Sequence, residues 1–369
     1  MNNVFPNQSI LAFEDLTSEY KLIREHSLDK AKTWFPLYPT KELAQIAAAL
    51  MTDGHIDWNT YDENPRPKKL VLYSNKKEEC EWFLKQVMDL FHESGQVVQY
   101  KSNTGYSRVQ SYKAVVYCAQ LARLLIKIGI PCGDKTKKAY LIPHWIMNGD
   151  LEMKKGFLRT LFTFDGSIAK KSRNVLDVSL TFSMNKKEEF VQNGKEFLEQ
   201  VKNLLKEIEV KAGNIHIRRC QKDKFTLILS ICNQESAVNF FKNVGFLCPQ
   251  KQRRLEDLVH MIYLHGKVDS EFAVRILVEL KIKTGTDKRT IEQINKIAGT
   301  VYTYRQFEHM RRNEDRIPIR MITSAIKLLD KPTYFDGLPQ YCRELILLYD
   351  QSSPAINLSN AFLASSSLI

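Results

Sequence analysis

The feature that most constrains the fold of this chain is an internal duplication. Residues 43–56 read LAQIAAALMTDGHI, and residues 156–168 read GFLRTLFTFDGSI. Both are apolar, helix-length segments that end in Asp-Gly-x-Ile, and Asp53 and Asp165 are 112 positions apart. This period is far longer than that of a solenoid repeat, so the pattern predicts two related lobes in one chain.

The segments that follow each apolar stretch also match. Each is followed by three stretches that are rich in β-branched or aromatic residues with partial alternation, which is typical of strands. These stretches are 70–74, 96–100 and 114–118 after the first segment, and 176–183, 213–218 and 225–230 after the second. Helices are expected between them, at about 77–93 and 186–210.

Each copy then closes with a helix and a phrase that ends in lysine. The phrase GIPCGDK ends at Lys135, and VGFLCPQK ends at Lys251, which is 82 and 86 positions after the respective aspartate. The chain is therefore predicted to be α+β, with two pseudo-symmetric lobes and an added C-terminal helical domain. The predicted division is an N-terminal extension (1–40), a first lobe (41–145), a second lobe (146–257), a helical domain (258–350) and a flexible tail (351–369).

Small residues recur at helical spacing in both apolar segments, at Ala44, Ala48 and Thr52 in the first and at Gly156 and Thr160 in the second. A stripe of small side chains lets two helix backbones approach closely, so the two segments are expected to pack side by side. Their C-terminal ends, each with an aspartate, would then meet.

Each of these helices is expected to end at a glycine, Gly54 or Gly166, in the left-handed conformation. An aspartate just before that end is disfavoured by the helix dipole, by roughly 0.3–1 kcal/mol. Two aspartates brought together also repel each other, and a divalent cation would relieve both costs. A site with few oxygen ligands suits Mg²⁺. For a single Asp-Gly pair, a plain helix stop followed by a turn would be the simpler interpretation.

The charge points to an anionic partner. The formal net charge is +12, and residues 41–257 hold most of the excess, with 35 basic and 25 acidic side chains. Nucleic acid is the commonest such partner. The seven cysteines are scattered without a CxxC pair, which indicates reduced thiols rather than zinc. No secretory signal or membrane span is expected, so the predicted location is the cytoplasm, or an organellar matrix if the chain is organelle-encoded.

The two apolar segments resemble the motif of the LAGLIDADG (dodecapeptide) homing endonucleases, in their single-chain form with two motifs. Residues 46–54 (IAAALMTDG) and 158–166 (LRTLFTFDG) align with the nine motif positions. The phrases FLRTLFTFDGS and GIPCGDK are also similar to that family, and the resemblance covers about 41–257. Phe164 departs from the usual small residue, so the helix contact there is expected to be looser or offset. Met51 and Thr163 stand where the family has an earlier, less critical acidic residue.

The resemblance implies a monomer with two αββαββα lobes whose motif helices form the interface between lobes. It implies a double-stranded DNA partner, read over a long site in the major groove, and Mg²⁺ as cofactor. The metal site would consist of Asp53, Asp165, Gly54 and Gly166, with each acid serving the cleavage of one strand. Lys135 and Lys251 match the lysines that stand near each scissile phosphate and would share catalysis with the two aspartates.

Basic residues in loops and strand ends are candidates for contacts with DNA phosphates or bases, although a solvated surface is an equally good interpretation for several. The predicted DNA-binding residues are Lys101, Arg108, Lys113, Lys170, Arg173, Arg218, Arg219, Lys224 and Arg305.

The segment 290–329 suggests a helix-turn-helix, with a turn at Gly299 and a basic-aromatic second helix. Tyr302, Tyr304, Arg305 and Gln306 would face DNA, whereas a helical packing domain is the alternative.

Three functions compete at this point. The first is a site-specific, metal-dependent homing endonuclease. The second is a maturase of the same fold that binds intron RNA, and the third is a non-catalytic transcription regulator. Retention of both Asp53 and Asp165 favours the first. An intein is not expected, because the chain lacks a Cys or Ser start and a His-Asn end.

Overall fold

Local capping and burial set the positions of the two motif helices, α3 (Lys41–Met51) and α7 (Leu151–Asp165). The Thr40 side chain accepts a hydrogen bond from the Leu43 backbone and starts α3, and Asp150 does the same for α7 through Met153. Both helices are buried along most of their length. In this computed structural model the described residues are 9–17, 25–59, 66–100, 111–168, 178–221, 223–268, 270–312 and 316–350.

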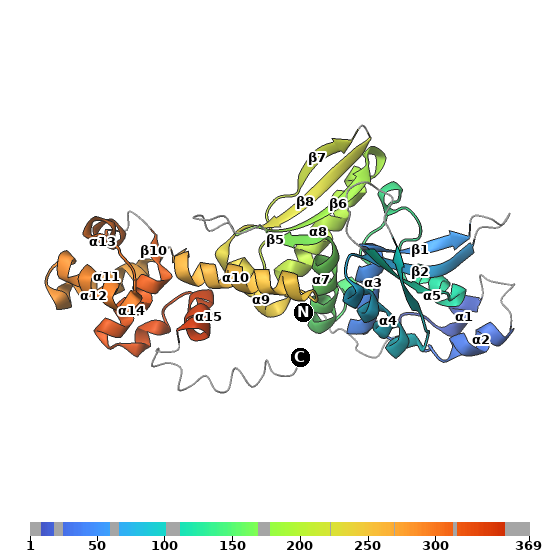
Figure 1. Ribbon diagram of the computed structural model, residues 1–369, viewed down its shortest axis with the longest axis horizontal. Coiled ribbons are helices and arrows are strands. Elements are labelled where there is room, and N and C mark those ends of the chain that lie inside the picture. The colour runs from blue at the N-terminus through green and yellow to red at the C-terminus, as the bar shows by residue number, and fades with distance from the viewer. Residues whose placement is uncertain are drawn as a thin grey trace. The chain divides into compact units, whose positions relative to one another are not determined.

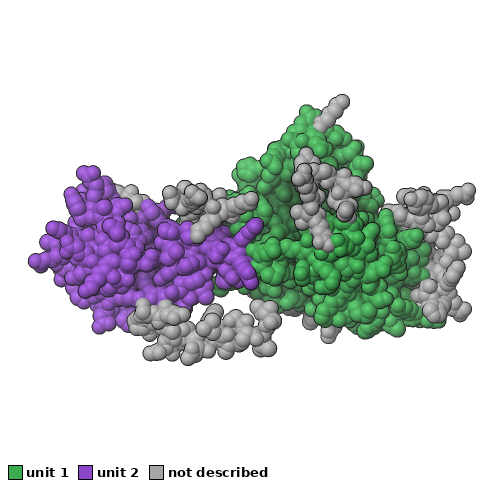
Figure 2. All heavy atoms as spheres, viewed as in Figure 1, with its two compact units in different colours: residues 1–169, 179–236, 242–252 green, residues 170–178, 237–241, 253–369 purple. Residues whose placement is uncertain are grey.

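The chain divides into two compact units (Figure 2). Unit 1 holds residues 1–169, 179–236 and 242–252, and unit 2 holds residues 170–178, 237–241 and 253–369. Nearly all of both lobes lies in unit 1, although residues 237–241 of the second lobe's last helix belong to unit 2, which is mainly helical. The division into five parts made from the sequence stays a prediction.

Each lobe has the order αββαββα, so the predicted fold class is confirmed (Figure 1). The first lobe consists of α3, β1 (Gly54–Asn59), β2 (Arg66–Ser74), α4 (Lys77–Phe91), β3 (Gln96–Tyr100), β4 (Ser111–Val116) and α5 (Ala119–Lys127). The second consists of α7, β5 (Gly166–Ile168), β6 (Leu180–Lys187), α8 (Val191–Glu207), β7 (His216–Gln221), β8 (Lys224–Ile231) and α9 (Gln234–Asn243). Short elements connect them: η1 (Lys135–Lys137), α6 (His144–Met147) and η2 (Glu188–Phe190).

The two sheets are antiparallel and have the same topology, with strand orders β1-β2-β4-β3 and β5-β6-β8-β7. Their registers correspond as well, because Gly54 pairs with Leu72 in the first sheet and Gly166 pairs with Phe182 in the second. The strands β1 and β5 begin directly at the motif glycines. Neither was among the strands expected from the sequence, since β5 is only three residues long and β1 follows the helix without a break.

The motif helices pack against each other within unit 1, as the stripe of small residues predicts (Figure 1). Ala44, Ala48 and Thr160 are fully buried. A Cβ atom at Gly156 would lie 2.7 Å from Cγ of Lys41, so the absence of a side chain at this position lets α7 pack closely against α3. The bulky Phe164 is buried and its ring lies 6.2 Å from that of Trp82 on α4, outside the run of small residues.

One face of each sheet is covered by helices. In the first lobe α4 and α5 cover buried side chains that include Leu70, Leu72 and Ala114, and in the second α8 covers Phe182 and Leu229. The N-terminal segment, with α1 (Phe13–Thr17) and α2 (Glu25–Lys32), packs on the first lobe, where Nε1 of Trp34 donates to the Phe91 carbonyl at 2.8 Å.

Unit 2 is built from helices around a two-stranded pairing of β9 (Lys267–Val268) with β10 (Ile317–Pro318). Helix α10 (Pro249–His265) leads into it. Its other helices are α11 (Glu271–Thr284), α12 (Asp287–Ala298), α13 (Tyr304–Arg311), α14 (Ile319–Leu329), η3 (Pro332–Phe335) and α15 (Gln340–Tyr349). Among the described residues, none of the helices combines the length and apolar character that a membrane crossing requires.

Candidate active site at the ends of the motif helices

The two aspartates lie at the C-terminal ends of α3 and α7 and are close enough to interact. Burial and the charge of Asp53 raise the pKa of Asp165 to about 7. Burial also raises the pKa of Asp53. Asp53 nevertheless keeps an exposed surface, and Asp165 is only partly buried. Water and cations can reach both carboxylates through this exposed surface. The pair is thus electrostatically coupled and open to solvent.

The motif glycines have a different role from the one expected. Gly166 has φ −86° and ψ 155°, and Gly54 is not among the glycines with positive φ, so the predicted left-handed conformation is wrong. Instead, a Cβ atom at Gly54 would lie 2.7 Å from the Ala49 carbonyl oxygen, and one at Gly166 would collide with the Phe162 carbonyl. Glycine is required here because the first strand of each lobe starts against the last turn of the motif helix.

Each motif helix is capped by the lysine of its own lobe's closing phrase. Nζ of Lys135 donates to the carbonyls of Leu50 at 3.1 Å, Gly54 at 2.5 Å and Thr52. Nζ of Lys251 donates in the same way to Thr163 at 2.5 Å, Phe164 at 3.3 Å and Gly166 at 2.7 Å. A cation on the free carbonyls offsets the negative end of the helix dipole. The protein therefore supplies part of the positive charge that the sequence assigned to a metal alone.

These lysines and aspartates form one charged group, here called the acid–lysine cluster (Asp53, Asp165, Lys135 and Lys251). Burial lowers the pKa of Lys135 to about 8, and the charges of Asp165 and Asp53 oppose this shift. Burial also lowers the pKa of Lys251. The charges of the two lysines partly offset the rise that burial causes in the pKa of each aspartate. The structure thus brings together all four residues that the sequence named as catalytic.

A second pair of lysines, Lys186 and Lys76, which sequence reasoning missed, connects the two lobes next to the cluster. Lys186 of β6 is fully buried, and its Nζ donates to the carbonyls of Lys135 at 3.0 Å and Lys138 at 2.7 Å. It also lies 3.8 Å from the centre of the Tyr140 ring. Lys186 belongs to the second lobe but holds the backbone of the loop that carries the first lobe's Lys135.

Lys76 makes the reverse connection, from the first lobe to the closing phrase of the second. It follows β2 of the first lobe, and its Nζ donates to Sγ of Cys248 in the second lobe's closing phrase. It also lies 3.7 Å from Glu79, whose charge adds to the rise that burial causes in the pKa of Asp53 and partly offsets the fall that burial causes in the pKa of Lys251. The signal was present in the sequence, since NKKEE occurs at 75–79 and again at 185–189, but residue 186 fell inside a predicted helix.

The described basic residues of the sheets lie on different faces. Lys113 of β4 lies 5.9 Å from the Tyr100 ring, and Tyr100 contacts Tyr73. In the second lobe Arg218 pairs with Thr226, whereas Arg219 points to the opposite face.

Arg218 and Arg219, on opposite faces of the second sheet, have different surroundings. Oγ1 of Thr226 donates to Oδ1 of Asn185 at 2.7 Å, so Arg218 lies beside a polar row. The Arg219 guanidinium instead lies 5.7 Å from the Phe225 ring. Lys224 begins β8 opposite Lys187, and Arg305 lies on α13 of unit 2. The predicted residues Lys101, Arg108, Lys170 and Arg173 lie outside the described residues.

The donor set fits a metal that takes few protein ligands. Among the described residues no group of three or more His, Cys, Asp or Glu side chains could hold a metal ion. Two paired carboxylates suit Mg²⁺, which retains water and takes oxygens from a phosphate substrate. The carbonyls of Gly54 and Gly166 already accept hydrogen bonds from the two lysines, so their role at a metal stays a prediction.

Comparison with known proteins adds family evidence for the second lobe. A model described as a LAGLIDADG-like domain matches residues 152–245, which confirms the resemblance found in the sequence. The chain is 14% identical to the crystal structure of I-DmoI in complex with DNA and Ca, over 59% of this chain and 97% of that one, with a TM-score of 0.41.

Two relatives among curated proteins are much longer than this chain. The chain is 28% identical over 316 residues to the tRNA-splicing ligase RtcB of Pyrococcus furiosus, which covers 82% of this chain and 31% of the ligase. It is 25% identical over 229 residues to the DNA-directed RNA polymerase subunit Rpo1N of Methanocaldococcus jannaschii, which covers 58% of this chain and 16% of the subunit. The chain thus spans less than a third of the length of either relative.

Proposed function

Because the second lobe of this chain is a LAGLIDADG-like domain and the first lobe repeats its plan, we propose that the chain is a double-strand DNA endonuclease of the homing type. The observation that carries this proposal is the acid–lysine cluster. Two solvent-accessible carboxylates and two lysines lie where the motif helices meet. The duplication supplies one acid and one lysine for each DNA strand.

Asp53 and Asp165 would hold Mg²⁺ through their carboxylate oxygens. Bound there, the ion supplies Lewis-acid activation of water and of a phosphodiester. The side chains of the cluster do the rest. Lys135 has a pKa of about 8 and is mostly cationic at neutral pH. Lys135 and Lys251 therefore place fixed positive charge next to a phosphate that gains negative charge in the transition state.

The sheets provide surface for a duplex beside the cluster. In the first lobe Lys113 lies with Tyr73 and Tyr100, and in the second Arg218 lies with Thr226 and Asn185. Hydroxyl, amide and guanidinium groups are the side chains that read base edges and phosphates. The net charge of +12 favours association with the DNA backbone.

The curated relatives support the proposal that this chain is encoded by a mobile genetic segment. RtcB and Rpo1N are named for unrelated activities, and this chain matches only 31% and 16% of their lengths. A segment shared by two such different proteins does not account for the ligase or the polymerase activity. It fits a coding segment that inserts into different hosts, which is what cleavage of a specific insertion site makes possible.

The test begins with the full chain, Mg²⁺ and circular DNA that carries a randomised insert. We expect a subset of circles to be linearised, and sequencing of the ends gives the target. On that target, Asp53→Asn and Asp165→Asn should each nick one strand, and the double variant should cut neither. Asp57→Asn is a matched control, because Asp57 pairs with Lys69 at 3.1 Å outside the cluster.

Two results would overturn the proposal. One is the absence of any linear product with Mg²⁺ or Mn²⁺. The other is a pair of single variants that cut both strands as fast as the wild type. Binding of structured RNA without DNA cleavage would instead favour a maturase.

A further inference from the structure

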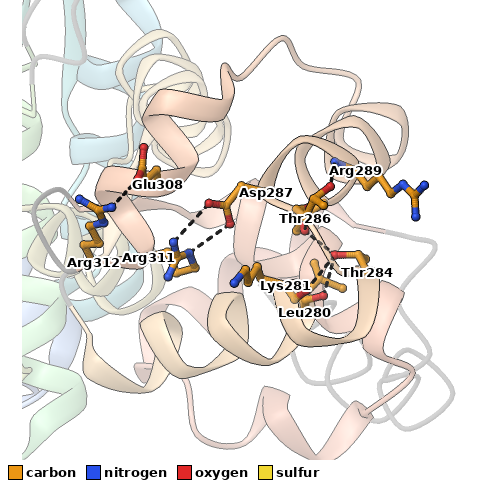
Figure 3. Close-up of polar contacts among 10 residues, drawn as sticks. Leu280, Lys281, Thr284, Thr286, Asp287, Arg289, Glu308, Arg311 and Arg312 are labelled. Carbon is orange, nitrogen blue, oxygen red and sulfur yellow. Dashed lines mark hydrogen bonds and ion pairs between the residues drawn. The ribbon is translucent and has the colours of Figure 1, made fainter.

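We propose that helices α12 and α13 of unit 2 form a second DNA-binding site, which takes a segment of duplex separate from the one that is cut. The inference goes beyond the proposed nuclease and does not require catalysis. The helix pair lies within the described residues 286–312 (Figure 3).

The turn between the two helices is rigidly built. Helix α12 ends at Gly299, which has a left-handed φ of +59°. The Asn295 side chain then holds the turn from both sides, because its Oδ1 accepts from the Tyr302 backbone at 2.8 Å and its Nδ2 donates to the Tyr302 carbonyl at 2.8 Å. Helix α13 begins with a capping box formed by Thr303 and Gln306.

The outer ends of the two helices are also fastened to each other. Arg311, at the end of α13, forms two hydrogen bonds of 3.2 Å with the carboxylate of Asp287, at the start of α12 (Figure 3). Both side chains are largely buried, with 20% and 22% of their surface exposed, so the pair is better shielded than an ordinary surface ion pair. The crossing of α12 and α13 is thereby fixed at both ends.

Helix α13 has one buried stripe and one exposed basic stripe. Phe307 and Met310 are buried within unit 2. On the other side Arg305 and His309 are exposed four residues apart, which places them on one helical face. Arg312, which follows the last residue of α13, is also exposed and pairs with Glu308 (Figure 3). A basic stripe on a short helix held by a rigid turn fits the width of a DNA major groove.

The first turn of α13 is the part best suited to touch bases. Tyr304 is 59% exposed, and Val301 in the preceding turn is 92% exposed. Arg305 is exposed as well, and its guanidinium forms no ion pair or hydrogen bond with the described part of the chain. An arginine in this position can donate two hydrogen bonds to a guanine edge. Lys288 and Arg289, exposed in the first turn of α12, are placed to meet phosphates as the first helix crosses the backbone.

The structure also corrects the set expected from the sequence. Tyr302 is only partly exposed and its backbone is held by Asn295, and Oε1 of Gln306 accepts the Thr303 backbone hydrogen bond at 2.8 Å. These two residues build the turn and the helix start. Tyr304 and Arg305 keep the recognition role, and His309 and Arg312 join them.

The experiment uses the full-length chain in EDTA, so that binding is measured without cutting. Duplexes are selected from a randomised library, and protected bases are mapped by footprinting on the selected DNA. We expect two protected segments. Arg305→Ala should lose the protection of one segment and weaken binding by about ten- to a hundredfold, as expected for loss of a bidentate base contact.

Arg275→Ala is the matched control, because Arg275 is an exposed arginine of α11 outside the helix pair. Its footprint should equal that of the wild type, and circular dichroism checks that both variants are folded. An unchanged footprint for Arg305→Ala overturns the inference, and so does equal loss in both variants or displacement of the duplex by RNA.

The outcome is separable from that of the nuclease proposal. If the chain never cuts DNA but Arg305→Ala shortens the footprint, the nuclease fails and the second site stands. If Asp53→Asn and Asp165→Asn each lose the cutting of one strand while Arg305→Ala changes no footprint, the nuclease stands and the second site fails.

Discussion

Replacing Asp165 by asparagine should stabilise the metal-free chain at alkaline pH while it removes one nuclease site. In the folded chain burial, followed by the charge of Asp53, raises the pKa of Asp165 from 3.8 to about 7. A raised carboxyl pKa means that folding disfavours the charged form. Stability from this group is therefore full at low pH, falls as the pH rises from about 4 to 7, and stays low above 7.

The size of the effect follows from the shift. A change of one pKa unit corresponds to about 1.4 kcal/mol, so the full penalty on ionised Asp165 is about 4 kcal/mol. Water reaches the partly buried carboxylate, and we expect about 2 kcal/mol to be measured. Asparagine has a similar shape and no charge, so Asp165→Asn should gain about that much at pH 8 and less than half of it at pH 5.

The assay is urea unfolding of wild type and variant in EDTA at pH 5 and pH 8, followed by circular dichroism. Asp134→Asn provides a control of opposite sign. Although burial opposes the effect, hydrogen bonds from Thr136 lower the pKa of Asp134, so its loss should destabilise the chain at pH 8. The reasoning is refuted if Asp165→Asn destabilises the metal-free chain at pH 8, or if its gain is the same at both pH values.

Three further predictions test the same region. Mg²⁺ should raise the melting temperature of the wild type more than that of Asp165→Asn, because only the wild type has both carboxylates; equal shifts in calorimetry would contradict a shared site. Gly166→Ala should cost about 1–3 kcal/mol in urea unfolding, since its Cβ collides with the Phe162 carbonyl, and a neutral effect would show that the strand start can move. Lys186→Met should slow the cutting of one strand and Lys76→Met that of the other, since each lysine holds the closing phrase of the opposite lobe; a nicking assay that finds both strands slowed equally would point to a general loss of structure.

Much of the fold was predictable because the sequence contains an internal duplication, so each element of a lobe has a counterpart in the other. The two Asp-Gly segments, the strands after them and the closing phrases give the lobes and their order without any knowledge of contacts. The repetition also marked the positions of the four residues of the acid–lysine cluster, and the resemblance to the LAGLIDADG family supplied the expected role of the two lysines. The short strand β5 was not predicted, because three residues after a helix carry too little pattern to be recognised.

Residues with one local pattern received different roles from their three-dimensional surroundings. Arg218 and Arg219 are neighbours in sequence, yet one lies beside Thr226 on a polar face and the other over the Phe225 ring. Gln306 resembles a base-reading residue in sequence, but its side chain caps the helix that carries it.

The sequence by itself determined that two equivalent acids end two equivalent helices, because duplication and helical spacing are local properties of the chain. Only the tertiary structure decided what surrounds those acids. Lys135 reaches a helix end more than 80 residues away, and Lys76 contacts Cys248 across 172 positions. The first contact depends on how the first lobe folds, and the second depends on how one lobe packs against the other. Periodicity within a single helix or strand tells which face is buried but not which distant group it meets.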